Sequence, residues 1–384
     1  MRTRLGLWWA VLACGLVAGH ADCLAQAPTI PDDVVASVHA RVDHGYNVGI
    51  VVGVVNRQGR TYFAYGRTVV SGDEQPDEST VFEIGSITKV FTSILLADMV
   101  ERGEVALDDP IERFLPDSVK APTRGGRSIT LVDLATQTSG LPRMPANFAP
   151  ADAANPYADY SVKQMYDFLS NYTLRRDIGA QYEYSNYGVG LLGHILTLRA
   201  GVDYEELVKE RITDVLGMPD TRVTLTPEMR SRLAAGHAGS QQVANWDIPT
   251  LAGAGALRST AQDMLAFLAA NLGLTETPLQ AAMAMTHEAR HEAGSPQMHI
   301  GLGWHIRTGG DHVVVWHNGG TGGYRSFAGF VEETQTGVVV LTNTAMSADD
   351  IGFHVLDASL PLRAVRIPSS SILRSSINTW GATR

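Results

Sequence analysis

Residues 82–103 read FEIGSITKVFTSILLADMVERG, and the rest of the chain can be interpreted around this stretch. Residues 90–100 are apolar almost all round, which is typical of a helix buried on every side. Gly103 then ends the run, as a glycine commonly does at the C-terminus of a helix. Ser86 stands at the expected N-terminal end. Lys89, three residues later, shares its helix face, so the amine can reach the hydroxyl.

Lysine is scarce in this chain, and Lys89 is the only lysine with a serine three residues before it. Burial and helix-end amides would lower the pKa of its amine from a reference of about 10.4 toward a value useful for a base. The alternative is an ordinary helix N-cap at Ser86 and a surface lysine whose stem covers apolar groups. A lysine that enters so apolar a helix needs a reason to be buried. We therefore expect Ser86 to be the covalent nucleophile of a serine acyl-hydrolase.

A second motif, Tyr184-Ser185-Asn186, stands just before an apolar helix that begins near Gly188. A tyrosine and an amide two residues apart in a turn can both point into a cleft. Held near cationic groups, Tyr184 is expected to give up its proton more readily than free tyrosine and to shuttle a proton from Ser86 to the leaving group. Asn186 is expected to donate to the acyl-amide carbonyl of a substrate. The alternative is a turn asparagine beside a packed aromatic residue.

A third motif, His317-Asn318-Gly319-Gly320, follows the apolar run 313–316. Glycines beside a strand let a substrate backbone approach closely and pair along the strand edge. The amide of Gly320 is expected to join that of the nucleophile as an oxyanion hole. His317 is expected to lie over the site as a cation or a hydrogen-bond donor. The alternative is a hairpin loop that happens to be rich in glycine.

The two ends of the chain have strand patterns, and the middle has helical ones. The expected strand pairs are residues 47–56 with 61–65, 303–307 with 312–316, and 324–331 with 337–342. Helical apolar spacing is found over residues 162–169, 188–198, 204–216, 261–272 and 349–360. These patterns predict a sheet-containing lobe, from about residues 30–85 and 300–366, with a mainly helical lobe from about residues 86–299 inserted in it. A ligand site is expected in the cleft between the lobes.

Composition restricts the possible partners. The chain has 384 residues, is 45% hydrophobic and carries a net charge of -10. Binding to nucleic acid or to an anionic membrane would need a basic surface, so a small-molecule or peptide substrate is expected instead. We see no internal repeat, low-complexity tract or long linker, and the two lobes are therefore expected to form one compact unit.

The N-terminus has the layout of a secretory signal peptide: basic residues, an apolar run over residues 5–18, and then small residues. Cleavage is expected after Ala25 or Ala27, which assigns residues 1–25 to the signal and 26–384 to the hydrolase domain. No later window reaches the roughly 18 uninterrupted apolar residues that a transmembrane helix requires. The mature protein is expected to be exported, as a periplasmic or secreted protein.

Both cysteines, Cys14 and Cys23, lie in this N-terminal segment, so a mature chain that begins at Gln26 would have no disulfide. An alternative interpretation is a lipoprotein signal with a lipid on Cys14, which Leu12 disfavours.

The order of the three motifs, Ser-x-x-Lys, Tyr-x-Asn and His-x-Gly, resembles that of the serine β-lactamase and penicillin-binding-protein superfamily. The Tyr-x-Asn form points to its class C β-lactamase and DD-peptidase branch. Stretches at residues 103–115, 129–142 and 216–218 look similar too, and the resemblance extends from about residue 35 to residue 360. It implies an α/β (α+β) fold with an antiparallel sheet flanked by helices and an inserted all-helical lobe.

The resemblance also implies a role for each motif. Ser86 would be the nucleophile, on the central helix, and Lys89 and Tyr184 the proton-handling pair. Asn186 would be a substrate amide donor, and the stretch from His317 through Asn318 to Gly319 the binding strand. No metal or organic cofactor is implied.

Some positions depart from the pattern of this branch. Its β-lactamases usually have lysine where this chain has His317, although histidine occurs in some DD-peptidases, D-aminopeptidases and esterases of the family; a fixed positive charge for a substrate carboxylate is thereby weakened. The last helix offers Asp349, Asp350 and His354 where β-lactamases commonly have cationic or amide anchors. Gln137 stands where relatives often have histidine.

These observations leave three functions open. The first is an enzyme that forms and hydrolyses an acyl-Ser86 intermediate, acting on β-lactams or on D-Ala-D-Ala-type peptides. The second is a carboxylesterase that acts on short acyl esters through the same residues. The third is a penicillin-recognising receptor that acylates but barely deacylates.

Overall fold

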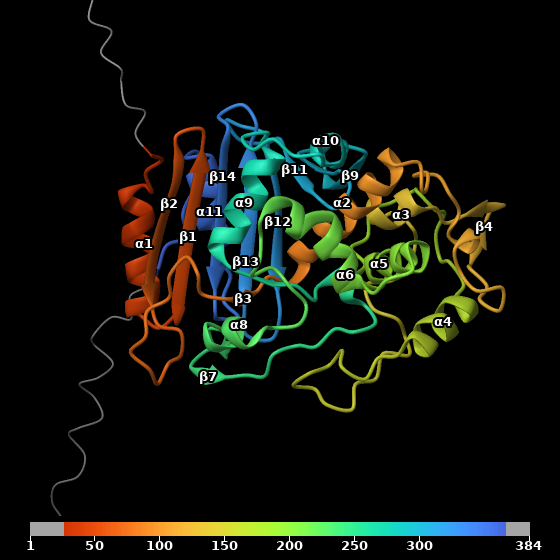
Figure 1. The fold of residues 1–384 in the computed structure, drawn as a ribbon, viewed down its shortest axis with the longest axis horizontal. Helices are drawn as coiled ribbons and strands as arrows, with labels where there is room; N and C mark the ends of the chain where they lie inside the picture. Colours follow the sequence, from red (N-terminus) through yellow and green to blue (C-terminus); the bar gives the residue numbers. More distant parts are fainter. Residues whose placement is uncertain (1–26, 366–384) are drawn as a thin grey trace, which may run out of the picture.

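The computed structural model describes residues 27–365, in which an eight-stranded antiparallel sheet forms one side of the molecule (Figure 1). The expected signal peptide and both cysteines lie outside the described residues. In spatial order the strands are β2 (Gly59–Gly66), β1 (Gly49–Asn56), β14 (Thr336–Thr342), β13 (Arg325–Val331), β12 (Val314–Gly320), β11 (His305–Arg307), β10 (Met298–Ile300) and β9 (His291–Ser295). The pairing of β1 with β14 joins strands from the two ends of the chain.

The sheet has an apolar cluster on each face, because neighbouring residues of a strand point to opposite sides. In β1, Ile50 and Val52 pack with the helices α1 (Asp32–Asp43) and α11 (Asp349–Leu356). Val51 belongs to the larger cluster on the other face, which includes α9 (Ala261–Asn271). All but one residue of β1 is buried, which explains its nearly continuous apolar sequence.

A helical region lies beside the sheet, on the right in Figure 1. At its centre is α2 (Thr88–Glu101), in which every residue from Thr88 to Met99 is buried. It packs against α5 (Asn186–Ala200) and α10 (Gln280–His287). The other helices are α3 (Leu131–Ala135), α4 (Val162–Asn171), α6 (Tyr204–Val208), a π-helical turn (Lys209–Thr213), α7 (Asp214–Leu216) and α8 (Pro227–Ser231).

Short elements complete the fold. The 3-10 turns are η1 (Gly85–Ile87), η2 (Ile111–Arg113) and η4 (Ala252–Ala254). Three two-stranded ladders pair β3 (Phe82–Glu83) with β8 (Arg258–Ser259), β4 (Thr123–Arg124) with β5 (Arg127–Ser128), and β6 (His237–Ala238) with β7 (Gln241–Gln242). The β3–β8 ladder lies directly before η1 and holds the entry to α2 in place.

The predicted strand pairs and helices are confirmed with shifted bounds, and so is the fold class. The helix predicted over residues 349–360 ends at Leu356, and the one predicted over 204–216 contains the π-helical turn. The sequence analysis did not identify α1 or the hairpin of β9 and β10. Helix α9 falls in the stretch expected to form the helical lobe, yet it packs on the sheet.

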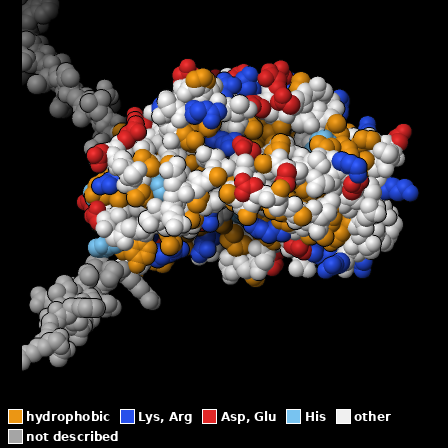
Figure 2. All heavy atoms as spheres, turned by 90° about the horizontal axis from the view of Figure 1, so that it is seen from below, with side chains coloured by type: hydrophobic (Ala, Val, Ile, Leu, Met, Phe, Trp, Pro, Cys, Tyr) orange, Lys and Arg blue, Asp and Glu red, His pale blue; other side chains and the backbone are white. Residues whose placement is uncertain are grey.

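Within residues 27–365, no helix combines the length and the apolar character that a membrane crossing requires. On the face shown in Figure 2, acidic and basic side chains are interspersed with apolar ones. The excess of negative charge is therefore not gathered into one acidic area on this face.

Candidate active site

Ser86 lies in η1, the single turn that leads into α2, and its side chain opens into a pocket. Gly85 before it has a φ of +51°, a conformation that favours glycine. A Cβ at Gly85 would come within 2.7 Å of the backbone nitrogen of Gly320. A glycine at position 85 thus lets the nucleophile turn and the end of β12 approach each other closely.

Lys89 is fully buried, and its Nζ lies 3.0 Å from the Ser86 Oγ. The same Nζ donates a hydrogen bond to the carbonyl oxygen of Ala254 at 2.5 Å. Burial, and then the positive charge of Arg143, lower the pKa of Lys89 well below its usual value. A neutral amine next to a serine hydroxyl can accept its proton, so this geometry provides a nucleophile and a base.

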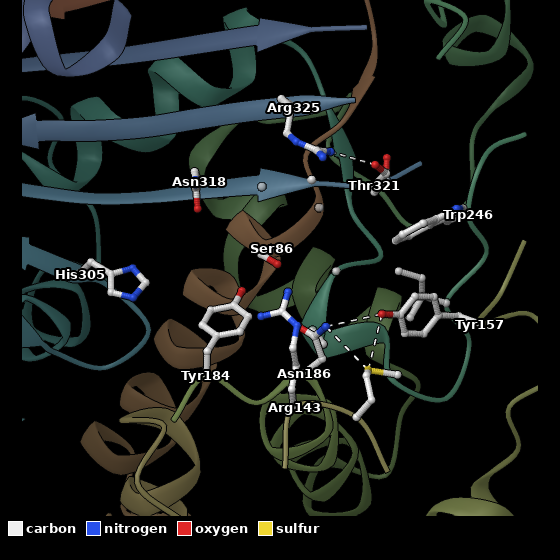
Figure 3. A pocket seen from close by; sticks show the side chains of 17 residues that line it. Ser86, Arg143, Tyr157, Tyr184, Asn186, Trp246, His305, Asn318, Thr321 and Arg325 are labelled. Carbon is white, nitrogen blue, oxygen red and sulfur yellow. Dashed lines mark hydrogen bonds between the residues drawn. The ribbon is translucent and has the colours of Figure 1, made fainter. Parts of the chain in front are cut away.

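Tyr184 completes a triangle with these two residues. Its ring centroid is 4.8 Å from the Lys89 Nζ, and its hydroxyl points toward Ser86 (Figure 3). The prediction that nearby cations would make Tyr184 more acidic is wrong in direction. Burial raises the pKa of Tyr184, and the nearby Ser86 hydroxyl and the Arg143 charge offset this only in part. The phenol is therefore protonated at neutral pH and can donate a proton rather than accept one.

Gln137 holds the second motif in place. Its backbone has a φ of +62°, uncommon for a residue other than glycine. Its side-chain oxygen accepts a hydrogen bond from the Ser185 amide at 2.7 Å, and its backbone oxygen accepts one from the Glu183 amide at 2.8 Å. These bonds flank Tyr184 on both sides. The sequence analysis had no interpretation for Gln137, and its structural role is to fix the turn that carries Tyr184.

Asn186 is the first residue of α5 and lines the pocket. Its amide nitrogen lies 3.5 Å from the Tyr157 hydroxyl and 3.8 Å from the Met144 sulfur, both long contacts. Its Oδ1 is buried and has no hydrogen-bond partner among the described residues. An amide with unused hydrogen-bonding capacity in a pocket wall is suited to binding an amide of a ligand.

The third motif forms the end of β12 and packs directly on the nucleophile turn. A Cβ at Gly319 would lie 1.9 Å from the carbonyl oxygen of Ile84, so no larger residue fits there. Gly319, Gly320 and Asn318 line the pocket. The Asn318 amide donates to the Asp349 carboxylate at 2.6 Å, which explains where one of the acidic residues of the last helix points.

His317 does not take the position expected for it. Only 1% of the residue is exposed, and it is not among the residues that line the pocket. Its Nδ1 lies 2.6 Å from the Asn318 carbonyl oxygen, a geometry in which Nδ1 donates. Burial, together with His305 and Lys89, lowers the pKa of His317 well below its usual value. The expectation of a cation over the site is therefore wrong, because the strand turns this side chain inward.

Two arginines supply the positive charge instead, and the sequence analysis identified neither. Arg143 and Arg325 line the pocket of about 530 Å³ into which Ser86 opens, and no aspartate or glutamate lines it. Neither forms an ion pair within residues 27–365, although the Arg143 guanidinium lies 5.0 Å from the centroid of the Tyr184 ring. In Figure 3 the Ser86 hydroxyl is seen between the two guanidinium groups. In the sequence, Arg143 directly follows Leu141-Pro142 and Arg325 directly follows Tyr324. These positions close to the motifs were the only sequence feature that could have indicated a place in the pocket.

His305 and Trp246 also line the pocket and were not identified from the sequence. The His305 Nε2 lies 2.9 Å from the Tyr182 hydroxyl, and burial lowers the pKa of His305 to about 4. It is therefore neutral at physiological pH. Among the described residues, no cluster of three or more His, Cys, Asp or Glu side chains could hold a metal ion.

The chain is similar to known proteins over most of its length. The sequence model of the Beta-lactamase family matches residues 34–355 of the chain. The D-alanyl-D-alanine-carboxypeptidase/endopeptidase AmpH of Escherichia coli (strain K12) is 29% identical over 361 residues, covering 89% of this chain and 92% of that protein. A beta-lactamase of the same strain is 25% identical over 362 residues, covering 85% and 92%. The crystal structure of a beta-lactamase/D-alanine carboxypeptidase from Yersinia pestis, complexed with citrate, superposes with a TM-score of 0.74 at 25% identity, over 84% of this chain and 96% of that one.

Proposed function

We propose that the chain, which belongs to the Beta-lactamase family and is a serine hydrolase, hydrolyses D-alanyl-D-alanine-type peptides through an acyl-Ser86 intermediate. β-Lactams are the second proposed substrate class. The observation that carries the proposal is the distance of 3.0 Å between the Lys89 Nζ and the Ser86 Oγ, in a site where burial lowers the pKa of the amine. The relative AmpH is named as a D-alanyl-D-alanine carboxypeptidase, which supports the peptide as the first substrate to test.

In the first half of the proposed reaction, Lys89 takes the proton of Ser86 as the Oγ attacks the acyl carbonyl carbon. The bond from that carbon to the leaving nitrogen then breaks, and the nitrogen receives a proton through Tyr184, whose ring lies 4.8 Å from the Lys89 Nζ. The backbone amides of Ser86 and Gly320 would stabilise the negative charge on the carbonyl oxygen. The close approach of Gly85 to the Gly320 nitrogen supports this assignment.

In the second half, water attacks the acyl-enzyme ester and gives a proton to the same proton-handling pair, which passes a proton to the Ser86 Oγ as the ester bond breaks. Asn186 would donate to an amide carbonyl in the acyl part of the substrate. Arg143, which lies close to Tyr184, would attract the carboxylate of a leaving D-alanine. A pocket with two arginines and no acidic side chain supports a carboxylate substrate over a neutral ester.

The test is a substrate panel with the mature chain: a D-Ala-D-Ala peptide, nitrocefin and 4-nitrophenyl butyrate. We expect release of D-alanine from the peptide, and loss of this activity in the Ser86→Ala variant. Turnover of the ester alone would overturn the substrate assignment in favour of a carboxylesterase. A stable adduct with nitrocefin and no turnover of any substrate would favour a penicillin-recognising receptor. Full activity in Ser86→Ala would overturn the mechanism itself.

The base is tested separately with Lys89→Ala. Residues of a catalytic unit act together, so we expect acylation to fall by several orders of magnitude. A fall smaller than about tenfold would contradict the assignment of Lys89 as the base. The surface lysine Lys163, whose side chain is 82% exposed and pairs with Asp167, provides the matched control Lys163→Ala, which should retain full activity.

A further inference from the structure

Arg325, the first residue of β13, brings a guanidinium to the pocket with much of its hydrogen-bonding capacity unused. Its Nη1 donates to the backbone oxygens of Thr321 at 2.9 Å and Tyr324 at 2.8 Å. Its Nε and Nη2 have no hydrogen-bond partner within residues 27–365. The two backbone bonds fix the direction of the group and leave one edge of it available to a ligand (Figure 3).

The position of this guanidinium depends on Gly320, its partner in the β12–β13 ladder. A Cβ at Gly320 would lie 2.7 Å from the Arg325 Nη1 and 3.0 Å from its Cζ. The guanidinium thus lies on the bare backbone of the residue whose amide we assign to the oxyanion hole. It is close to the reacting carbonyl without belonging to the proton-handling pair.

The charge of Arg325 is only weakly compensated by the protein. The Asp349 carboxylate attracts the Arg325 guanidinium but forms no ion pair with it. Asp349 instead accepts a hydrogen bond from the Asn318 amide at 2.6 Å. Burial lowers the pKa of Arg325, and the attraction of Asp349 offsets this only in part. A partly buried cation without a partner costs free energy, which an anionic ligand would recover.

The proposed chemistry indicates which part of a substrate would lie near Arg325. The leaving group must lie at Tyr184, which supplies its proton, and the Arg143 guanidinium, 5.0 Å from the Tyr184 ring, is within reach of a carboxylate on that group. Arg325 lies on the opposite side of Ser86 from Arg143 (Figure 3), directly against the backbone of Gly320. The acyl part of a substrate would extend toward it.

We propose that Arg325 is a specificity residue that selects substrates with a carboxylate in the acyl part, separate from any carboxylate in the leaving group. This inference rests on the proposed function for the direction in which the substrate lies. Its ligands are dianionic N-acyl-D-amino acids, with one carboxylate near Arg143 and the other at Arg325. A simple neutral acyl chain would leave the Arg325 charge without a partner.

The test compares the binding of two ligands, pentanoyl-D-alanine and glutaryl-D-alanine, which have equal chain length and differ in the terminal carboxylate. Calorimetry with the Ser86→Ala variant measures binding without turnover. We expect glutaryl-D-alanine to bind at least about tenfold more tightly, as a charge-assisted hydrogen bond would provide. The added substitution Arg325→Gln should remove this ratio while leaving pentanoyl-D-alanine binding within about threefold.

Matched variants separate a specific contact from general electrostatics. Arg143→Gln removes the same unit of charge from the same pocket, and it should weaken both ligands while keeping the ratio between them. Arg325→Lys keeps the charge and should keep part of the ratio. If Arg325→Gln does not fold, the salt dependence of the Ser86→Ala variant is measured instead. The ratio of its affinities for glutaryl-D-alanine and pentanoyl-D-alanine must decrease as the salt concentration is raised, because screening weakens a partly exposed ion pair. A ratio near one in Ser86→Ala, a ratio unchanged by Arg325→Gln, or a ratio insensitive to salt would each overturn the proposal.

This experiment is independent of the test of the proposed function. Binding is measured in a variant that cannot form the acyl-enzyme, so an absence of peptide hydrolysis in the wild-type chain would not affect the ratio. Conversely, hydrolysis of D-Ala-D-Ala peptides with a binding ratio of one would leave the proposed function standing and remove the role of Arg325.

Discussion

Lys89 depends on its surroundings for its chemistry, since only burial and the neighbouring Arg143 lower its pKa. The unprotonated amine is the active form, so kcat/KM should rise with pH as Lys89 loses its proton. Removing the Arg143 charge removes a repulsion that favours the neutral amine. In Arg143→Gln the pKa of Lys89 should therefore increase, and the acidic limb of the pH profile should move to higher pH.

The measurement is the pH dependence of kcat/KM for an uncharged substrate such as 4-nitrophenyl butyrate, so that loss of carboxylate binding does not contribute. The buried His305 and His317 also face Lys89, but burial keeps both neutral through this range. Arg325→Gln is the control, because Arg325 is not among the groups that shift the pKa of Lys89. An acidic limb at the same pH in both variants would contradict the role of Arg143.

Gln137 supports a second prediction at this scale. In Gln137→Ala the buried Ser185 amide loses its acceptor, which should cost about 1–3 kcal/mol of unfolding free energy. The turn carrying Tyr184 would loosen, and kcat should fall while KM changes little. The control is Gln335→Ala, since Gln335 has a comparable φ of +52° but lies in a turn away from the pocket. Equal, small effects of the two substitutions in denaturant titrations would argue against this role of Gln137.

The sequence predicted the reactive residues better than their electrostatic states. Ser86 and Lys89 are three residues apart on a helix, and such local geometry can be deduced from sequence. The pKa direction of Tyr184 could not be, because it depends on how many atoms the fold packs around the ring. Likewise, nothing in the local sequence of an arginine tells whether it faces a pocket, and Arg143 and Arg325 were missed for that reason.

At the scale of elements, the contact between β12 and η1 decides the shape of the site. Gly319→Ala places a methyl group against the backbone of Ile84, which neither element can avoid without moving. We expect strand and turn to separate, with kcat/KM reduced at least about a hundredfold and with lower thermal stability. Gly309→Ala is the control, because its Cβ would meet only the flexible side chain of Gln297. Wild-type kinetics in Gly319→Ala would refute the close packing described here.

The elements themselves were predictable where their patterns are local. The strand β1 has a β-branched run, and its hairpin with β2 was predicted correctly. The strands β9 and β10 contain almost no such residues, so only pairing with β11 reveals them as strands. Helix α1 has Val34, Val38 and Val42 at helical spacing, a signal that was present and missed.

At the scale of the whole molecule, the helical region is an insertion between the strands β2 and β9. The chain leaves the sheet through the nucleophile turn, and β12 later presents the glycine motif against the same turn. This topology places the pocket where the two parts meet. The larger apolar cluster is continuous across that junction, since it contains Val339 of the sheet, Phe91 of α2 and Leu191 of α5.

A continuous core predicts that the two parts unfold together. Phe91 is fully buried and stacks on Phe267 of α9 at a centroid distance of 4.3 Å, so it joins α2 to the sheet side of the molecule. Phe91→Ala should lower the unfolding free energy by about 3–5 kcal/mol. Denaturant titrations followed by far-UV circular dichroism and by tryptophan fluorescence should still coincide. Phe114→Ala, at a half-buried site, should lower the unfolding free energy by less.

Two separated transitions in Phe91→Ala would mean that the helical part unfolds by itself and that the junction holding the pocket is an interface between independent folding units.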